Sequence, residues 1–293
     1  MDIFVVLLGA LEFRIDSISC VPSAPKPKKI LALLLLYRNQ IVPVSVLVEE
    51  LWGNRPPASA RTTLQTYILT LRKLLQCAKS GGGEHLVTVG SGYILKVPEV
   101  AFDLYRFDQL AKQGREAIGQ GDDEKGVIAL RQALDLYRGQ ALVDVDAGHL
   151  VTAHVTRLEE TRLTTLEMCI DAEMRLGRHQ ELLGELGTLA AHHRFHENLH
   201  AQYMRALWRS GRRSCALDVY QRLRRSLATE LGMEPAWFVQ ELQSAILSPS
   251  DPESFDCQEL PDTGGCTRSA ADATAARPAS TRTYGTPHPN TSL

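Results

Sequence analysis

The pattern of apolar and polar positions is most regular in residues 58–75, where it predicts an amphipathic helix. Leu64, Ile68, Leu71 and Leu75 recur at the spacing of one face of an α-helix. The opposite face carries short hydroxyl side chains and a lysine, and an arginine flanks it on either side: Ser59, Thr62, Thr63, Thr66, Thr70, Lys73, Arg61 and Arg72. The segment contains no carboxylate.

This polar face is typical of a helix that contacts nucleic acid. A helix whose outer face serves only solubility usually carries Glu–Lys pairs four residues apart. Short hydroxyls allow close approach to base edges and phosphates, and arginine and lysine hold the DNA backbone. We therefore interpret residues 58–75 as a recognition helix. The alternative is an ordinary core helix with a threonine-rich outer face, and the neighbouring segments must decide between the two.

The segments on either side predict a winged helix-turn-helix. Short apolar runs at residues 3–8 and 11–15 indicate strands, and amphipathic patterns predict helices that begin at Lys28 and at Val44. After the recognition helix, the strand-like segments 85–89 (HLVTV) and 93–97 (YILKV) surround a Gly-Ser-Gly tip, which predicts a β-hairpin. Three helices followed by a hairpin make a helix-turn-helix with a wing. The alternative is a hairpin that only caps the core.

Residues 103–247 show helical patterns throughout, and part of the pattern repeats. The segments 172–178 (AEMRLGR) and 206–212 (ALWRSGR) both begin with Ala and end with Gly-Arg, and they lie 34 residues apart. A weaker copy surrounds Gly121. A 34-residue step with a Gly-Arg turn predicts tetratricopeptide-like helical hairpins, which must stack to bury their apolar faces. A helical bundle without a binding role is the alternative.

The predicted fold is therefore mainly α, with an N-terminal winged helix-turn-helix that has a small β-sheet, followed by an all-α tetratricopeptide-like domain. We place the first domain at residues 1–98 and the second at residues 99–247. Residues 248–293 are rich in Pro, Ser, Thr, Gly and Ala without periodicity, so we expect a disordered tail.

Charge and composition add modest support. The net charge of −2 hides a gradient, because residues 1–100 hold 11 Lys and Arg against 7 Asp and Glu. A basic N-terminal unit fits a polyanion-binding domain. The six cysteines form no C-x-x-C pair, which is consistent with a reducing compartment. The N-terminus lacks the basic start of a signal peptide, and no apolar run is long enough for a bilayer, so we expect a cytoplasmic, nucleoid-associated protein.

Enzymatic motifs are weak or absent. His196-Glu197-Asn198-Leu199-His200 matches the H-E-x-x-H zinc motif, but no third ligand follows at the expected spacing. The chain contains no phosphate-binding loop and no G-x-S-x-G elbow. We expect no enzyme activity, no metal and no cofactor, and no receiver domain ahead of the winged helix.

The amino-acid sequence of several segments resembles that of the Streptomyces antibiotic regulatory protein family, which has an OmpR-type winged helix. The resemblance covers nearly all of residues 1–247. The matching segments are residues 47–53 (LVEELWG), 56–61 (PPASAR), 63–73 (TLQTYILTLRK), 92–95 (GYIL) and 230–235 (ELGMEP). Relatives often carry an arginine just before the wing tip, where this chain has Val89 and Gly90.

The resemblance implies a transcription activator whose helical part is a bacterial transcriptional activation domain. It implies binding to tandem direct repeats near the −35 region of promoters in a secondary-metabolite (antibiotic) gene cluster, with recruitment of RNA polymerase and its sigma factor. Protomers would associate on those repeats. Together with the helix pattern, it predicts that double-stranded DNA is contacted by Arg61, Thr62, Thr63, Thr66, Tyr67, Thr70, Arg72, Lys73, Ser91 and Tyr93. The second hypothesis is a tetratricopeptide-like scaffold that binds protein and no specific DNA.

Overall fold

The N-terminal strands form a small antiparallel sheet in the computed structural model, which describes residues 3–77 and 85–248. Strands β1 (Ile3–Val6), β2 (Glu12–Ile15) and β3 (Ile18–Ser19) lie in that order. Phe13 and Ile15 are buried, whereas Arg14 between them is exposed, as a half-buried strand requires. Asp16 and Ser17 both have positive φ, which is the backbone of the tight turn that joins β2 to β3.

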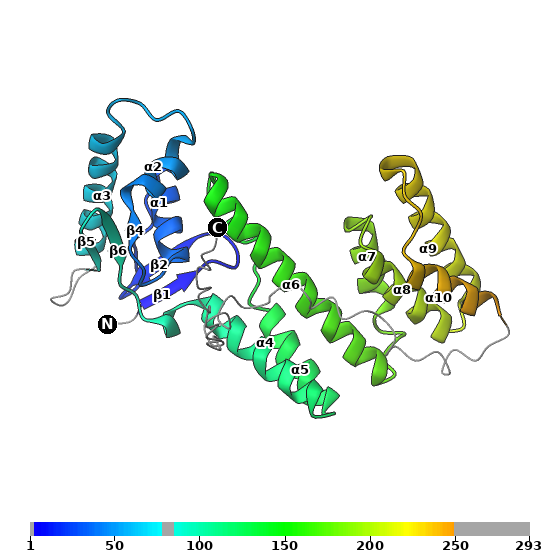
Figure 1. The fold of residues 1–293 in the computed structure, drawn as a ribbon. Coiled ribbons are helices and arrows are strands. Elements are labelled where there is room, and N and C mark those ends of the chain that lie inside the picture. The colour runs from blue at the N-terminus through cyan, green and yellow to red at the C-terminus, as the bar shows by residue number, and fades with distance from the viewer. Residues whose placement is uncertain (1–2, 78–84, 249–293) are drawn as a thin grey trace, which may run out of the picture. The chain divides into compact units, whose positions relative to one another are not determined.

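Three helices and a second sheet follow, and they make the predicted winged helix-turn-helix (Figure 1). The helices are α1 (Pro25–Leu36), α2 (Val44–Trp52) and α3 (Ala60–Cys77). The second sheet has the order β4 (Val42–Pro43), β6 (Gly92–Leu95) and β5 (Leu86–Val89), all antiparallel. Because β4 precedes α2, the wing is paired to the start of the helix-turn-helix and not only to its own hairpin.

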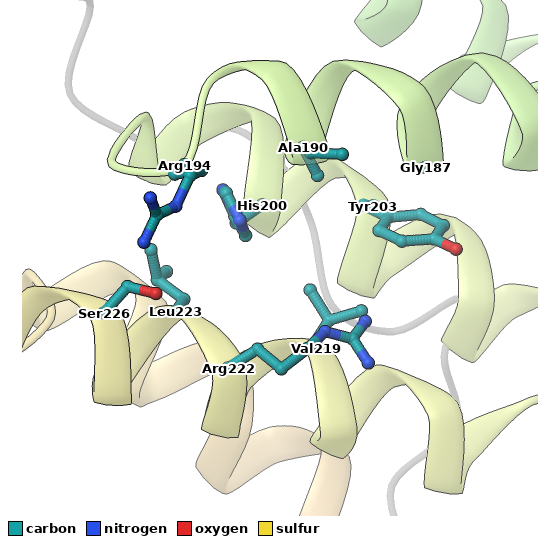
Figure 2. Close-up of a pocket in the computed structure, with 10 residues that line it drawn as sticks. Gly187, Ala190, Arg194, His200, Tyr203, Val219, Arg222, Leu223 and Ser226 are labelled. Atoms are coloured by element: carbon teal, nitrogen blue, oxygen red, sulfur yellow. The ribbon is translucent and has the colours of Figure 1, made fainter.

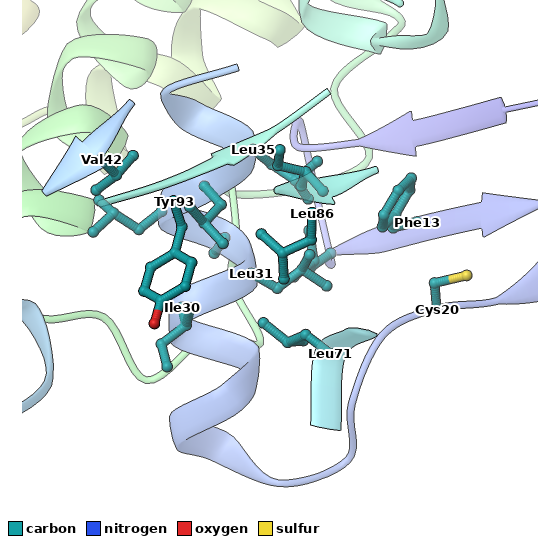
Figure 3. Packing of buried hydrophobic residues seen from close by; sticks show 14 of the residues in the cluster. Phe13, Cys20, Ile30, Leu31, Leu35, Val42, Leu71, Leu86 and Tyr93 are labelled. Carbon is teal, nitrogen blue, oxygen red and sulfur yellow. The ribbon is translucent and has the colours of Figure 1, made fainter. Parts of the chain in front are cut away.

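The core of this part lies between α1, α3 and the two sheets. The four apolar positions of the predicted stripe, Leu64, Ile68, Leu71 and Leu75, are all buried. Figure 3 shows Leu71 directed toward Leu31 of α1 and Leu86 of β5. Burying each of these side chains contributes about 1.5–3 kcal/mol. The inner face of α3 is therefore fully used for packing, and only its outer face is left for contacts outside the chain.

The rest of the described chain is helical. It contains the 3₁₀ turn η1 (Glu99–Ala101), helices α4 (Asp103–Gly119), α5 (Asp123–Leu134), α6 (His149–Arg175), α7 (Leu183–His192), α8 (Glu197–Arg209) and α9 (Arg213–Ser226), the π-helical turn η2 (Leu227–Leu231), and α10 (Trp237–Leu247). Among the residues described, no helix has the length and apolar character needed to cross a bilayer.

The predicted helical repeat is confirmed by three identical turns. Gly121, Gly177 and Gly211 end α4, α6 and α8 with φ of 82°, 78° and 75°. In each turn the glycine N–H donates to the carbonyl three residues back, and the next N–H donates to the carbonyl five residues before it. This is the Schellman arrangement, which favours glycine because its left-handed conformation clashes with a Cβ. The repeat could be predicted from the sequence because this turn favours glycine at one fixed position.

The hydrophobic core continues across the predicted boundary at residue 98. The cluster that contains the recognition helix also contains Phe102, Leu142, Val145 and Val151. All described residues belong to one compact unit. The division into residues 1–98 and 99–247 stays a prediction, and the tail at 248–293 lies outside the described residues apart from Ser248.

Candidate nucleic-acid interface

The outer face of α3 is open to solvent along its whole polar stripe. Thr62, Thr66 and Thr70, one helical turn apart, are exposed, and so are Arg61 and Lys73. Thr63 and Tyr67 are half-buried at the edge of the stripe. The surface is an exposed line of hydroxyls with a cation at each end and no carboxylate on the helix. Such a surface is suited to the grooves and phosphates of a duplex.

The threonine hydroxyls are already engaged with the backbone of the helix. Thr66 Oγ1 donates to the Thr62 carbonyl at 3.2 Å, and Thr70 Oγ1 donates to the Thr66 carbonyl at 3.0 Å. Each hydroxyl hydrogen is therefore used, and each oxygen keeps its lone pairs. The outward chemistry of Thr66 and Thr70 is that of an acceptor and a methyl group, which suits amino groups of bases and thymine methyls.

Arg72 has a role that the sequence pattern did not indicate. Its Nε donates to the Leu86 carbonyl at 3.2 Å, and one terminal guanidinium nitrogen donates to Thr88 Oγ1 at 2.7 Å. Both acceptors are on β5, so Arg72 ties the recognition helix to the wing. Two of the three guanidinium nitrogens are therefore committed within the chain, and a contact between Arg72 and DNA stays a prediction. Thr88, which the helix and wing patterns did not single out, is its partner.

Tyr93 is also placed differently from the prediction. Only 8% of its surface is exposed, and it belongs to the core cluster, where β6 pairs it with Val42 and Thr88. Figure 3 shows its ring beside Ile30 of α1. The aromatic ring fills the core beneath the wing, so Tyr93 positions the wing, and a direct contact between Tyr93 and DNA stays a prediction. A tyrosine in a short strand has the same sequence pattern whether it packs in the core or contacts DNA, so the sequence alone does not show its burial.

Ser91 is exposed at the wing tip and also fixes the start of α2. Its carbonyl accepts a hydrogen bond from Val44 N at 2.9 Å. Gly92 beside it has no room for a side chain, since an added Cβ would lie 2.6 Å from the Val42 carbonyl oxygen. The wing tip is therefore held against the first turn of α2. Its exposed residues are Thr88, Val89, Gly90 and Ser91.

A concave surface of about 830 Å³ lies between the start of α2, the α2–α3 loop, the start of α3 and the wing. Arg61 and Gln65 of α3 line it together with Ser91. Gln65 is exposed and follows Thr62 by three positions, so it extends the polar stripe by one hydrogen-bonding side chain. The predicted contact residues do not include Gln65, although its spacing already places it beside Thr62.

The H-E-x-x-H segment at residues 196–200 serves the packing of the helical part. The Glu197 carboxylate accepts a hydrogen bond from Ala236 N, and His200 Nδ1 lies 3.1 Å from the His196 carbonyl oxygen. Within the described part of the chain, no three His, Cys, Asp or Glu side chains come together as metal ligands. Glu197 is thus occupied with the residue that precedes α10.

Comparison with known proteins finds a matching family model for each of the two parts of the chain. Residues 19–95 match the family model described as "Transcriptional regulatory protein, C terminal", and residues 102–247 match "Bacterial transcriptional activator domain". Regulatory protein DnrI of Streptomyces peucetius is 47% identical over 248 residues, which is 82% of this chain and 90% of DnrI. Regulatory protein AfsR of Streptomyces coelicolor is 37% identical over 247 residues, 84% of this chain but 24% of AfsR.

A solved structure agrees with the fold. Mycobacterium tuberculosis EmbR, determined in complex with a low affinity phosphopeptide, matches with a TM-score of 0.77 at 33% identity. The match covers 86% of this chain and 67% of the EmbR chain. The two family models, the likeness to DnrI and the exposed polar face of α3 agree with one another. The chain therefore belongs to the Streptomyces antibiotic regulatory protein family, and it is a DNA-binding transcriptional activator.

Proposed function

We propose that α3 lies in the major groove of promoter DNA and that its outer face reads the sequence. Thr62, Thr66 and Thr70 face base edges, and Arg61 and Lys73 contact phosphates on either side. The observation that carries this proposal is the exposure of the whole hydroxyl stripe on a helix without carboxylates. An α-helix fits the major groove, and short hydroxyl side chains let it approach the bases closely.

The wing contributes a smaller part of the affinity. Val89 and Gly90, at its tip, offer no cation to a phosphate, and Ser91 offers a hydroxyl. The wing is held in place by Arg72 and by the bond between Ser91 and Val44. We infer that the wing approaches the DNA backbone with Ser91 and the exposed hydroxyl of Thr88.

The target is a set of promoters in a secondary-metabolite gene cluster, bound at tandem direct repeats near the −35 region. Membership of the family supports this target, as does the likeness to DnrI over most of both chains. Direct repeats place protomers head to tail, so two copies on DNA contact each other through unlike faces. The protein acts on chromosomal DNA in the cytoplasm.

The helical part recruits RNA polymerase holoenzyme through an exposed apolar stretch. Leu231, Met233 and Trp237 are all exposed, and they fall within seven residues between η2 and the first turn of α10. Exposed apolar side chains that gather in one stretch are typical of a protein contact. Trp237→Ala should reduce promoter activation several-fold and leave DNA affinity unchanged. Ile128→Ala on α5, with the same 58% exposure, is the matched control.

Footprinting on the promoters around the gene of this protein tests the DNA-binding proposal directly. We expect protected direct repeats, and a competitor-resistant gel shift on the same fragments. Log affinity should fall with log salt concentration, with a slope of about −0.9 for each phosphate contacted. The scaffold hypothesis instead requires that no specific shift appears on any of these fragments, and a salt slope of zero would reject the docking of α3 as well.

A further inference from the structure

A cavity of about 330 Å³ lies among α7, α8 and α9, far along the chain from the recognition helix (Figure 2). Helix α7 contributes Gly187 and Ala190, α8 contributes His200 and Tyr203, and α9 contributes Val219, Arg222 and Leu223. Its volume is within the range of sites for small molecules.

The walls divide into an apolar side and a cationic side. Ala190, Val219 and Leu223 are buried and apolar. Two arginines, Arg194 and Arg222, face the same space, and none of the residues that line it is acidic. Arg194 is already paired with Glu230. Arg222 has no hydrogen bond or ion pair with any other residue that the structure describes, so its guanidinium is the cation that a ligand would meet.

His200 adds a hydrogen-bonding group whose tautomer is set by the fold. The side chain is 6% exposed, and Nδ1 lies 3.1 Å from the His196 carbonyl oxygen, to which it must donate. The other ring nitrogen, Nε2, has no partner within the described chain. Burial lowers the pKa of His200, and the charge of Arg222 lowers it further, which outweighs the opposing effect of the hydrogen bond to the His196 carbonyl. At neutral pH its Nε2 is therefore an acceptor that faces the cavity.

Tyr203 closes one end of the cavity because α7 has a glycine opposite it. A Cβ added to Gly187 would lie 3.2 Å from the Tyr203 hydroxyl oxygen, so a larger residue would displace the ring. Figure 2 shows Tyr203 and His200 on one side of the space and Val219 and Arg222 on the other. The cavity thus has an aromatic wall, an apolar floor, one unpaired cation and one acceptor.

We propose that this cavity binds a small organic carboxylate that also carries a hydroxyl group. The carboxylate accepts hydrogen bonds from the Arg222 guanidinium, which matches the geometry of a carboxylate with two parallel N–H groups. The hydroxyl donates to His200 Nε2, and the apolar body lies against Val219 and Leu223. Because three helices contribute to the site, the bound anion stabilises their packing.

The test uses the full-length protein and two probes of different length, 3-hydroxybenzoate and 4-hydroxyphenylacetate. Binding is measured by calorimetry and by the shift of the thermal midpoint at constant ionic strength. We expect saturable binding of at least one probe. Its deoxy counterpart should bind about fivefold more weakly, because it lacks the hydrogen bond to His200. Its neutral amide should not bind, because it lacks the stronger, charge-assisted hydrogen bond to Arg222. If neither probe binds up to about 10 mM, or if acid and amide bind equally, the proposal is overturned.

Two variants identify the site. Arg222→Gln should weaken binding of the probe about tenfold or more, whereas Arg225→Gln, one turn further along α9 and outside the cavity, should leave it unchanged. Both arginines are exposed, so neither substitution threatens the fold. His200→Phe should abolish the preference for the hydroxylated probe over its deoxy counterpart. If Arg225→Gln weakens binding as much as Arg222→Gln does, the anion is held by surface charge and the cavity is not its site.

Discussion

The carboxylate of Glu50, on the second helix of the DNA-binding part, caps the first turn of α6 by accepting a 2.6 Å hydrogen bond from Gly148 N. Its other oxygen accepts bonds from Leu150 N and Val151 N. Glu50 is 3% exposed. A negative charge at the start of a 27-residue helix meets free N–H groups and the positive end of the helix dipole. This buried cap fastens α2 to the helical part.

Replacing Glu50 with glutamine should lower the free energy of unfolding by about 1–3 kcal/mol. The amide keeps a single acceptor oxygen and turns an NH₂ group toward N–H donors, which leaves buried groups unpaired. Urea denaturation of the full chain measures the change. Glu49→Gln is the matched control, because Glu49 is exposed and its Oε1 lies 3.3 Å from Nε2 of the exposed His149. It should alter stability by no more than about 0.5 kcal/mol. Equal losses for the two variants would refute the cap.

Contacts of this kind explain which parts of the fold were not predictable from the sequence. Glu50 and Gly148 are separated by 98 residues, and Asp103 accepts hydrogen bonds from Leu7 N and Leu8 N across the same boundary. Periodicity reports only neighbours three or four positions apart, so a single buried carboxylate that bridges distant segments leaves no pattern. The sequence places a boundary at residue 98 because the wing hairpin ends there and the helical pattern begins soon after, whereas the core extends across that position.

The predictable features were those with a local cause. The spacing of Leu64 and Leu71 indicated which face of α3 is buried, and Gly177 and Gly211 marked helix ends that only glycine tolerates easily. The sequence predicts DNA contacts for Arg72 because it flanks the polar face of the helix, and for Tyr93 because it lies in the wing. Their actual partners, Thr88 and the core, are reached only through the fold.

Substitution of the cations on α3 should separate phosphate contacts from residues that position the helix. Arg61→Ala should weaken DNA binding and reduce the magnitude of the salt slope by about 1, the value for one phosphate. Arg72→Ala should weaken binding too, because the wing loses its tie to α3, but should change the slope by much less. Filter binding at several salt concentrations measures both. A change in the salt slope for Arg72→Ala as large as that for Arg61→Ala would show that Arg72 also contacts a phosphate.

Thr66 should determine the preference at a single base pair. Thr66→Val removes the hydroxyl and keeps the shape of the side chain, so the affinity for the wild-type site should fall by roughly 1–3 kcal/mol at most. When the site is varied base by base, the altered preference should appear at one base position only. Thr66→Ser keeps the hydroxyl and removes the methyl group, which separates the acceptor from a contact with a thymine methyl. A uniform loss over all site variants would mean that Thr66 contacts only the DNA backbone.

Glu167 on α6 should make the stability of the helical part depend on pH. Its side chain is buried, and Oε1 lies 3.2 Å from His196 Nδ1. Burial, with a smaller contribution from the charge of Asp171, raises the pKa of Glu167 to about 7. The folded state therefore favours the neutral acid. This contribution to stability is complete below the unfolded pKa of about 4.5 and is lost as the pH rises through about 7.

The variant Glu167→Gln, which stays neutral at every pH, isolates this effect. Burial lowers the pKa of His196, so protonation of His196 reduces stability at low pH in both proteins, and the difference between them removes most of that contribution. Between about pH 5 and pH 8, the free energy of unfolding of the wild type should fall by about 2–3 kcal/mol relative to that of the variant. Urea denaturation at each pH measures this difference. Parallel stability curves for the two proteins would show that Glu167 is already ionised in the fold, held so by a protonated His196.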